Sequence, residues 1–242
     1  MSNNNIILVS GASGTGKSAC LRNLRDPKGV LYLCCENNKA LPFANNFRVK
    51  NITDPYQVHQ AFTYAETKDD IHTIVIDTAT FLMDMFESNY VLGAADTQSM
   101  WGQYAQFFKV LMSTYVAKST KKVIFLAHTA DVINDDRVRE TVVKVKGSLM
   151  ARGLESYFTI VISTKVMELD DLKPFESDLL HISEDDEEDE FKHCFQTRLV
   201  KGSSKERIRS PMGMWTRKET YIDNDIQKVF DKLDNFYHID EA

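Results

Sequence analysis

The sequence predicts an α/β fold in which a mainly parallel central sheet is flanked by helices on both faces. Three observations support this prediction. Short apolar runs rich in β-branched residues recur along the chain, they alternate with stretches of helical periodicity, and a glycine-rich turn directly follows the first run. Strands that are apolar throughout are typical of parallel sheets, because helices cover both of their faces.

The first two thirds of the chain hold the predicted core elements. Strands are expected at residues 6–9, 30–35, 47–52, 73–77, 123–127 and 157–163. Helices are expected at residues 17–24, which begin inside the glycine-rich turn, at 54–67, where Pro55 suits the first helical position, and at 98–118, where aromatic and aliphatic residues recur at helical spacing.

The last part of the chain has a different pattern. Residues 193–200 and 208–215 are expected to pair as a β-hairpin around a polar turn, followed by a helix that ends near residue 237. Residues 184–190 are all Asp or Glu, which predicts a solvated, mobile loop. No internal repeat or Pro- or Gly-rich linker divides the chain. We therefore expect one domain over residues 1–242, with a core at about 5–165 and a C-terminal hairpin and helix at about 190–238.

Composition and charge limit the partners. Of the 242 residues 43% are apolar, yet no apolar run approaches the roughly 20 residues that span a bilayer, so no membrane partner is expected. The start of the chain lacks the pattern of a secretory signal. The four cysteines (Cys20, Cys34, Cys35 and Cys194) show no C-x-x-C spacing, so we expect neither disulfides nor zinc, and a cytoplasmic location. The net charge of −6 means that a nucleic-acid site must be a local basic patch or be built by several subunits.

A phosphate-binding loop follows the first predicted strand. Its residues match the pattern G-x-x-x-x-G-K-[ST] and are Gly11, Ala12, Ser13, Gly14, Thr15, Gly16, Lys17 and Ser18, with Ala19 following. The glycines let successive backbone N–H groups point at phosphate oxygens, and the helix that follows adds its positive dipole end. Lys17 is expected to reach the β- and γ-phosphates and Ser18 to bind Mg²⁺. The loop thus predicts a nucleoside triphosphate with magnesium, and ATP is preferred because no N-K-x-D guanine-reading motif is present.

Three polar residues end other predicted strands, where they would meet the triphosphate. Asp77 is expected to hold Mg²⁺ through water. No Glu follows it, since the next residue is Thr78, and the role of the base that activates water is therefore assigned to Glu36. His128 is expected to sense the γ-phosphate. Each could instead be an ordinary polar residue at the end of a strand.

The order of these pieces resembles the RecA-like P-loop ATPase core, and it is most similar to short phage RecA-like ATPases of the single-strand annealing and recombination kind. The segments that carry the resemblance are VSGASGTGKS (9–18), TIVIDT (73–78), FLAHT (125–129), KGSL (146–149) and RSPMGMW (209–215). The resemblance implies an ATPase that acts on single-stranded DNA as a homo-oligomeric ring or filament, in the host cytoplasm if a phage encodes it. It also implies that the residue at Glu36 activates water and that the residue at His128 couples nucleotide state to DNA-binding loops.

The resemblance further implies two mobile DNA-binding loops and a basic finger supplied by a neighbouring subunit. The loops correspond to about residues 87–98 and 131–146. Basic candidates for DNA contact are confined to the second loop and are Arg137, Arg139, Lys144 and Lys146. Finger candidates from the C-terminal segment are Lys201, Lys205, Arg207 and Arg209, of which the two arginines are preferred for their fork geometry.

Two other function classes share the phosphate loop. One is a small-molecule or nucleoside kinase, which usually needs an Arg-rich lid and an acceptor pocket within one chain. The other is a nucleotide-controlled loader or scaffold with slow hydrolysis, in which Glu36 is structural. The long apolar-faced helix and the late basic segment favour the assembling ATPase.

Overall fold

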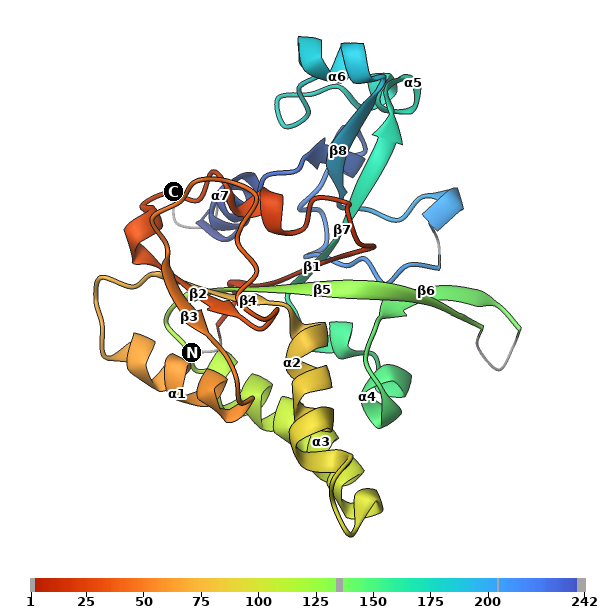
Figure 1. Cartoon of the computed structure of the whole chain (residues 1–242). Coiled ribbons are helices and arrows are strands. Elements are labelled where there is room, and N and C mark those ends of the chain that lie inside the picture. The colour runs from red at the N-terminus through yellow and green to blue at the C-terminus, as the bar shows by residue number, and fades with distance from the viewer. Residues whose placement is uncertain (1–2, 134–136, 204, 239–242) are drawn as a thin grey trace.

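The computed structural model describes residues 3–133, 137–203 and 205–238, and it contains the predicted sheet (Figure 1). In chain order the strands are β1 (Ile6–Gly11), β2 (Val30–Cys34), β3 (Arg48–Asn51), β4 (Thr73–Asp77), β5 (Lys122–Ile133), β6 (Arg139–Val143), β7 (Ile160–Glu168), β8 (Phe191–Gln196) and β9 (Tyr221–Asp223). Their spatial order is β3-β2-β4-β5-β1-β7-β8-β9, with β6 paired to the outer part of β5. Strands β3 to β7 of this order pair in parallel, whereas β6, β8 and β9 pair antiparallel.

Helices cover both faces of the sheet (Figure 1). They are α1 (Tyr56–Glu66), α2 (Ala79–Phe86), α3 (Thr97–Val110), α4 (Gly147–Arg152), α5 (Leu169–Leu172), α6 (Glu184–Asp189) and α7 (Ile226–His238). The π-helical turns Glu87–Val91 and Leu111–Val116 extend α2 and α3. Short 3₁₀ helices lie at Ser18–Leu21, Pro27–Gly29, Leu154–Tyr157, Lys173–Phe175, Lys201–Ser203 and Lys218–Thr220.

Alternation along the buried strands divides the core between the two faces. In β1, Ile6 and Leu8 pack with α1, α2 and α3, whereas Ile7 and Val9 pack with α7 and the 3₁₀ helix Ser18–Leu21. Successive side chains of a strand point to opposite faces, so a strand must be apolar throughout when both faces are covered. This double coverage confirms the predicted fold class, and the pairing of the strands places the ends of β1 and β4 beside residues Leu126 to His128 of β5.

The C-terminal hairpin was predicted between the wrong segments. Strand β8 pairs antiparallel with β7 and with β9, and does not pair with residues 208–215. Those residues instead lie along the remaining edge of β7, where Arg209 and Val161 exchange two backbone hydrogen bonds of 2.9 and 3.1 Å. Trp215 is buried in the core on the α7 face. Pairing with β7 and β9 satisfies more of the ladder groups of β8 than a local hairpin would.

Three further segments differ from the expectation. The acidic run predicted as a loop contains α6, whose first turn is fixed by a capping box between Ser183 and Asp186. The helix expected at residues 17–24 is only the 3₁₀ helix Ser18–Leu21, because the chain must turn at Asp26-Pro27 to enter β2. Half of the expected mobile loop at 131–146 belongs to the β5–β6 ladder, in which Asp131 pairs with Thr141 and Ile133 with Arg139, while residues 134–136 lie outside the described residues.

The other expected mobile loop, at about residues 87–98, is also partly ordered. Its first five residues form the π-helical turn Glu87–Val91, and α3 begins at Thr97. Only a short connection separates these two helical segments. The turn packs on the α1 face through Val91, which is buried in the same core as α2 and α3.

Candidate functional site

The strand order places the ends of β1 and β4 beside the middle of β5, because β5 continues past His128 to Ile133 and does not end at residue 127 as predicted. Strand β5 lies between the other two, with Gly11 of β1 opposite His128 and Asp77 of β4 opposite Leu126. Strand β2 follows β4, and Cys34 lies opposite Asp77, so Glu36 emerges beside them. Polar residues from four strands thus converge on one edge, as is usual for ligand sites of parallel α/β sheets.

The phosphate loop starts at the last residue of β1 and curls back over the sheet. Gly14 and Gly16 adopt left-handed φ values of 81° and 96°, which side chains other than glycine rarely tolerate. Gly16 is also tightly approached, because a Cβ atom there would lie 2.2 Å from Nδ2 of Asn224. The backbone path therefore favours glycine at both of these positions.

Lys17 is buried in the loop. Its Nζ donates to the carbonyl oxygens of Gly11 at 3.1 Å and Ala12 at 2.7 Å. Burial lowers the pKa of this ammonium, and the nearby carboxylates of Asp77 and Glu36 oppose that shift. An anionic phosphate would compete with the two carbonyls for the ammonium.

Asp77 forms the second half of the candidate site. Its Oδ2 accepts hydrogen bonds from Ser18 Oγ at 2.9 Å and from the Tyr32 hydroxyl at 2.6 Å. Its Oδ1 is buried and has no hydrogen-bond partner among the described residues. Burial raises the pKa of Asp77, and the hydrogen bonds from Tyr32 and Ser18 only partly offset this.

These groups fit a magnesium ion that also binds phosphates. A buried, partner-free carboxylate oxygen beside a hydroxyl is the hard oxygen donor set that Mg²⁺ prefers, and a cation there would favour the ionised carboxylate. Within the described residues no cluster of three or more His, Cys, Asp or Glu could hold a metal by itself. Ser18 and Asp77 would thus supply only part of the coordination, and phosphates and water the rest.

Glu36 and His128 form a second polar pair at the same edge. Glu36 Oε1 lies 3.3 Å from His128 Nε2, and its Oε2 accepts a 3.0 Å hydrogen bond from Lys39 Nζ. The hydrogen bond with His128 is the largest cause that lowers the pKa of Glu36 to about 2, with Lys39 adding to it against the effect of burial. The backbone N–H of His128 is itself held by Thr80 Oγ1 at 3.0 Å. The structure brings the expected base and the expected sensor into contact.

One cavity of about 630 Å³ contains all of these groups. Its lining includes Ser13, Gly14, Gly16, Lys17, Ser18, Ala19, Glu36, Asp77 and His128 from the predicted set. Gly11, Ala12 and Thr15 face the opposite side of the loop, and the Thr15 hydroxyl meets that of Thr164 there. The loop thus presents one side to the cavity and braces the other against β7.

Several residues that line the cavity were missed in the sequence. They are Arg22, Tyr32, Lys39, Ala40, Pro42, Asp186, Lys192, His193 and Asn224. Tyr32 had a signal, since it is a hydroxyl-bearing residue inside a strand next to β4. The last four come from segments far away in sequence, and no local pattern marks them.

Comparison with protein families agrees with this geometry. The model of the AAA domain matches residues 3–194. The chain belongs to this AAA domain family. No curated protein matched the chain. The chain therefore contains a nucleotide-binding domain with a P-loop ATPase fold, and the match ends within β8, before β9 and α7.

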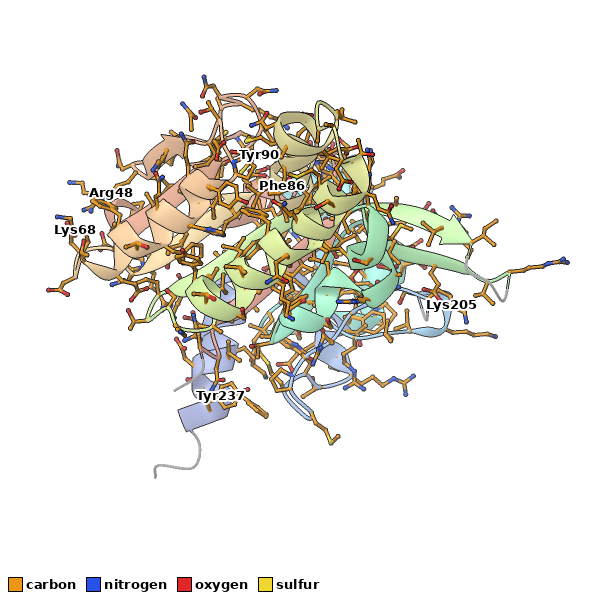
Figure 2. The ribbon with its side chains drawn as sticks, turned by 90° about the horizontal axis from the view of Figure 1, so that it is seen from below. Arg48, Lys68, Phe86, Tyr90, Lys205 and Tyr237 are labelled. Atoms are coloured by element: carbon orange, nitrogen blue, oxygen red, sulfur yellow. The ribbon has the colours of Figure 1, made fainter. Side chains whose placement is uncertain are left out.

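The finger candidates of the AAA domain lie away from its own cavity, and none of the four lines it. The guanidinium of Arg207 is held by Glu155 at 3.2 Å and Glu140 at 3.4 Å. Arg209 makes a 3.4 Å hydrogen bond to the Ser156 carbonyl. Lys201 and Lys205 are exposed, and Figure 2 shows Lys205 on the opposite side of the view from Arg48 and Lys68.

Two of the four DNA candidates of the AAA domain are held in ion pairs. Arg139 pairs with Asp131 across the β5–β6 ladder, and Lys146 pairs with Glu87 at 2.6 Å. Arg137 and Lys144 are exposed. Within the described ranges, no helix of the AAA domain is long and apolar enough to cross a membrane.

Proposed function

We propose that this AAA domain is a magnesium-dependent ATPase of the RecA-like phage type that acts on single-stranded DNA as a homo-oligomer. The observation that carries the ATPase part is the convergence of Lys17, the Ser18–Asp77 pair and the Glu36–His128 pair in one cavity. These are the groups that phosphoryl transfer to water requires: a cradle, a metal site and a water-orienting carboxylate.

The magnesium part is supported by Asp77. The ion would be held through the Ser18 hydroxyl and the carboxylate of Asp77, and it would neutralise charge that develops on the transferring phosphoryl group. Tyr32 keeps Oδ2 of Asp77 in place by donating to it. Lys17 would add a second positive charge at the phosphates.

Glu36 is proposed to orient the attacking water, and His128 to report on the γ-phosphate. The carboxylate of Glu36 can accept hydrogen bonds from water, and its partners His128 and Lys39 fix the position of this side chain. A γ-phosphate that drew His128 or Lys39 away would release the Glu36 carboxylate toward water. The bond between Glu36 and His128 thus links the base and the sensor.

The β5–β6 ladder supports the single-stranded DNA part. Strand β5 runs without interruption from the sheet core through His128 to the ladder, and the Lys144 N–H donates to the His128 carbonyl at 2.8 Å. A shift of His128 would therefore move β6, which begins at Arg139, two residues after exposed Arg137. Exposed cations of this kind bind nucleic-acid phosphates in a salt-dependent manner.

Assembly is proposed because none of the four finger candidates lines the cavity of its own chain. Arg207 is engaged by two carboxylates of its own chain, so Lys205 and Arg209 are the better finger candidates. A neighbour that offered one of them to this cavity would make hydrolysis depend on contact between subunits.

The experiment measures phosphate release from ATP with and without Mg²⁺ and with and without single-stranded DNA. Wild-type protein should require Mg²⁺ and be stimulated by single-stranded DNA, and Lys17→Ala should lose nucleotide binding and turnover. The double variant Arg137→Ala, Lys144→Ala should weaken the stimulation of turnover by DNA and leave the rate without DNA unchanged. The control variant Lys68→Ala, on the side opposite Lys205 in Figure 2, should change neither rate. A rate that DNA does not alter would contradict the DNA part alone, whereas transfer of phosphate to a small acceptor would indicate a kinase.

A nucleotide-controlled loader with slow hydrolysis is the second candidate. One observation favours it: with a pKa of about 2, Glu36 is a weak proton acceptor at neutral pH while His128 and Lys39 hold it. Tight ATP binding with little turnover, even with DNA present, would support this reading over the first.

A further inference from the structure

The cavity has a second wall that comes from the C-terminal part of the chain. Lys192 and His193 of β8, and Asn224 in the turn between β9 and α7, line it. Asn224 lies beyond the matched AAA model, which ends at residue 194. Lys192 and His193 lie within the matched residues, so Asn224 is the member of this wall that lies outside the match.

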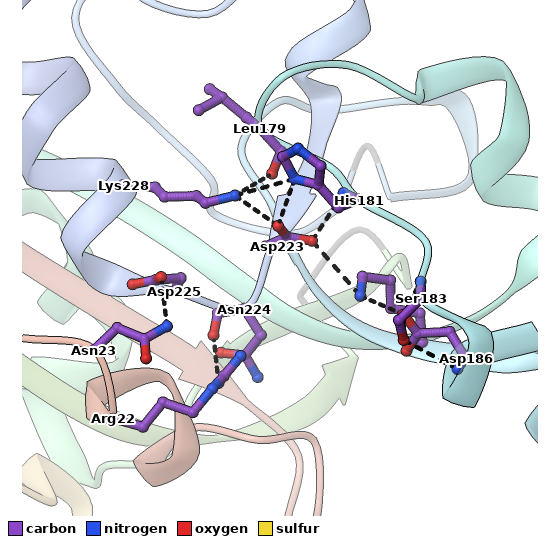
Figure 3. A network of polar contacts seen from close by, with 11 residues as sticks. Arg22, Asn23, Leu179, His181, Ser183, Asp186, Asp223, Asn224, Asp225 and Lys228 are labelled. Carbon is purple, nitrogen blue, oxygen red and sulfur yellow. Dashed lines mark hydrogen bonds and ion pairs between the residues drawn. The ribbon is translucent and has the colours of Figure 1, made fainter.

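A dense polar network fixes the turn that carries Asn224 (Figure 3). Arg22 donates to the Asn224 carbonyl at 2.8 Å, and Asn23 donates to the Asp225 carboxylate at 2.8 Å. On the other side Asp223 accepts from Lys228 at 2.6 Å. Burial raises the pKa of Asp223, but hydrogen bonds from Lys228 and His181 lower it by more, so the pKa lies below its usual value.

The side chain of Asn224 sits directly on the phosphate loop. Its Nδ2 donates to the Gly16 carbonyl at 3.0 Å, and the residue is 3% exposed. Its Oδ1 is buried and has no hydrogen-bond partner among the described residues. Buried amide oxygens are nearly always hydrogen-bonded, so an acceptor without a partner beside a ligand cavity points to a donor on the ligand.

The position of Asn224 selects which part of the ligand supplies that donor. The terminal phosphates belong near Lys17, Asp77 and Glu36, so a triphosphate that runs along the loop leaves its nucleoside toward Ala19 and Arg22. Arg22 bonds both the Ala19 and the Asn224 carbonyl oxygens, which places Asn224 at this end. Phosphate oxygens offer no donor at neutral pH, whereas the ribose hydroxyls and the exocyclic amine of adenine do.

We propose that Asn224 recognises the nucleoside of the bound triphosphate within the same chain, its Oδ1 accepting a hydrogen bond from a ribose hydroxyl or the base amine. This inference rests on the proposed nucleotide site and adds a residue that discriminates a nucleotide from bare polyphosphate. Asn224 thereby joins the phosphate loop and the C-terminal segment through one side chain that contacts both.

The first test compares affinities by calorimetry for Mg·ATP and Mg·tripolyphosphate. Asn224→Ala should lower the ratio of ATP affinity to tripolyphosphate affinity by about tenfold, as loss of one buried hydrogen bond does. The control Asn23→Ala disturbs the same network without touching the cavity and should keep the ratio. An equal loss of both affinities in Asn224→Ala would show that the residue only supports Gly16 and would overturn the inference.

The second test needs no variant and so does not depend on the folding of Asn224→Ala. Wild-type protein is titrated with ATP, with 2′,3′-dideoxy-ATP and with purine riboside triphosphate, which lacks the amine. If 2′,3′-dideoxy-ATP binds about tenfold more weakly than ATP, a ribose hydroxyl is the donor. If purine riboside triphosphate binds about tenfold more weakly, the base amine is the donor. If neither analogue binds more weakly than ATP, the inference is wrong. If wild-type protein binds neither ATP nor tripolyphosphate, the proposed function itself fails.

Discussion

At the scale of single residues, the site depends on a few carboxylates whose partners differ. Asp77 is buried with one oxygen bonded to Ser18 and Tyr32 and the other without a partner, which suits a metal. Glu36 instead has both oxygens engaged by cations or cation-capable groups. Two carboxylates at neighbouring strand ends are thereby set up for two different tasks.

The first prediction concerns Glu36→Gln. The amide keeps the shape and can still contact His128 and Lys39, so ATP affinity should change less than about threefold. It cannot accept a proton or hold water as a carboxylate does, so kcat should fall about 10²- to 10⁴-fold. Calorimetric titration measures the ATP affinity, and phosphate release measures kcat. Full turnover in this variant would move the water-activating role to another residue.

The second prediction concerns pH. The pKa of Glu36 is lowered from an unfolded value of 4.5 to about 2, so its contribution to stability is present above about pH 4.5 and is lost as pH falls toward 2. Glu36→Gln should therefore be less stable than wild type at pH 7, and the difference in the free energy of unfolding should narrow as pH falls from about 4.5 toward 2. Urea unfolding at each pH measures this, with Glu188→Gln on exposed α6 as control. A gap that stays constant with pH would show that the carboxylate is not paired in the folded state.

At the scale of elements, the C-terminal segment is fastened to the β5–β6 ladder by charge. Arg207 bridges Glu140 of β6 and Glu155, and Glu155 Oε1 accepts the Val143 N–H at 2.8 Å. The Thr141 N–H also donates to the Lys205 carbonyl at 3.1 Å. The C-terminal segment therefore stabilises the β5–β6 ladder, part of which was expected to be a mobile loop.

The third prediction follows from this bracing. Arg207→Ala leaves the buried carboxylate of Glu155 without this cation, and it should lower the free energy of unfolding by about 1–3 kcal/mol. Arg209→Ala, an exposed residue in the same segment, should change it by less than about 0.5 kcal/mol. Urea denaturation measures both. Similar small effects in both variants would mean that the Arg207 bridge contributes little.

The same scale shows why only some elements could be predicted. The strands β1, β2, β4 and β5 are apolar runs, and their ends determined where Asp77, Glu36 and His128 would meet. The partner of β8 could not be read locally, because pairing with β7 joins residues about 30 positions apart and competes with a nearer segment. Helix α6 had a signal in Ser183 and Asp186, three residues apart, but its uniform negative charge pointed to a loop.

At the scale of the whole molecule, the candidate site is assembled from segments that span almost the full sequence. One cavity is lined by the phosphate loop, by residues at or just after the ends of β2 and β4, by His128 of β5 and by the C-terminal wall. The first three groups were found in the sequence because a motif or a strand end marks them. Asn224 was not, since its role depends on a contact with Gly16 from 208 residues away.

The fourth prediction concerns assembly. If a neighbour supplies the finger, Lys205→Ala or Arg209→Ala should reduce turnover, and mixing the affected variant with inactive Lys17→Ala protein should restore part of it. In mixed oligomers the intact cavity of one subunit receives the intact finger of the other. Phosphate release after mixing measures this over a range of protein concentrations. No recovery at any ratio, with both proteins folded, would argue against a finger in trans.

The contact between Gly16 and Asn224 also has a consequence for biosynthesis. A ribosome makes the phosphate loop first, but the residue that leans on it emerges only after more than 200 further residues, since the two positions are 208 apart. A nascent chain would therefore carry an incomplete pocket for most of its translation, and its late-closing contacts slow folding. Cellular ATP would therefore stabilise the complete pocket only after Asn224 has left the exit tunnel.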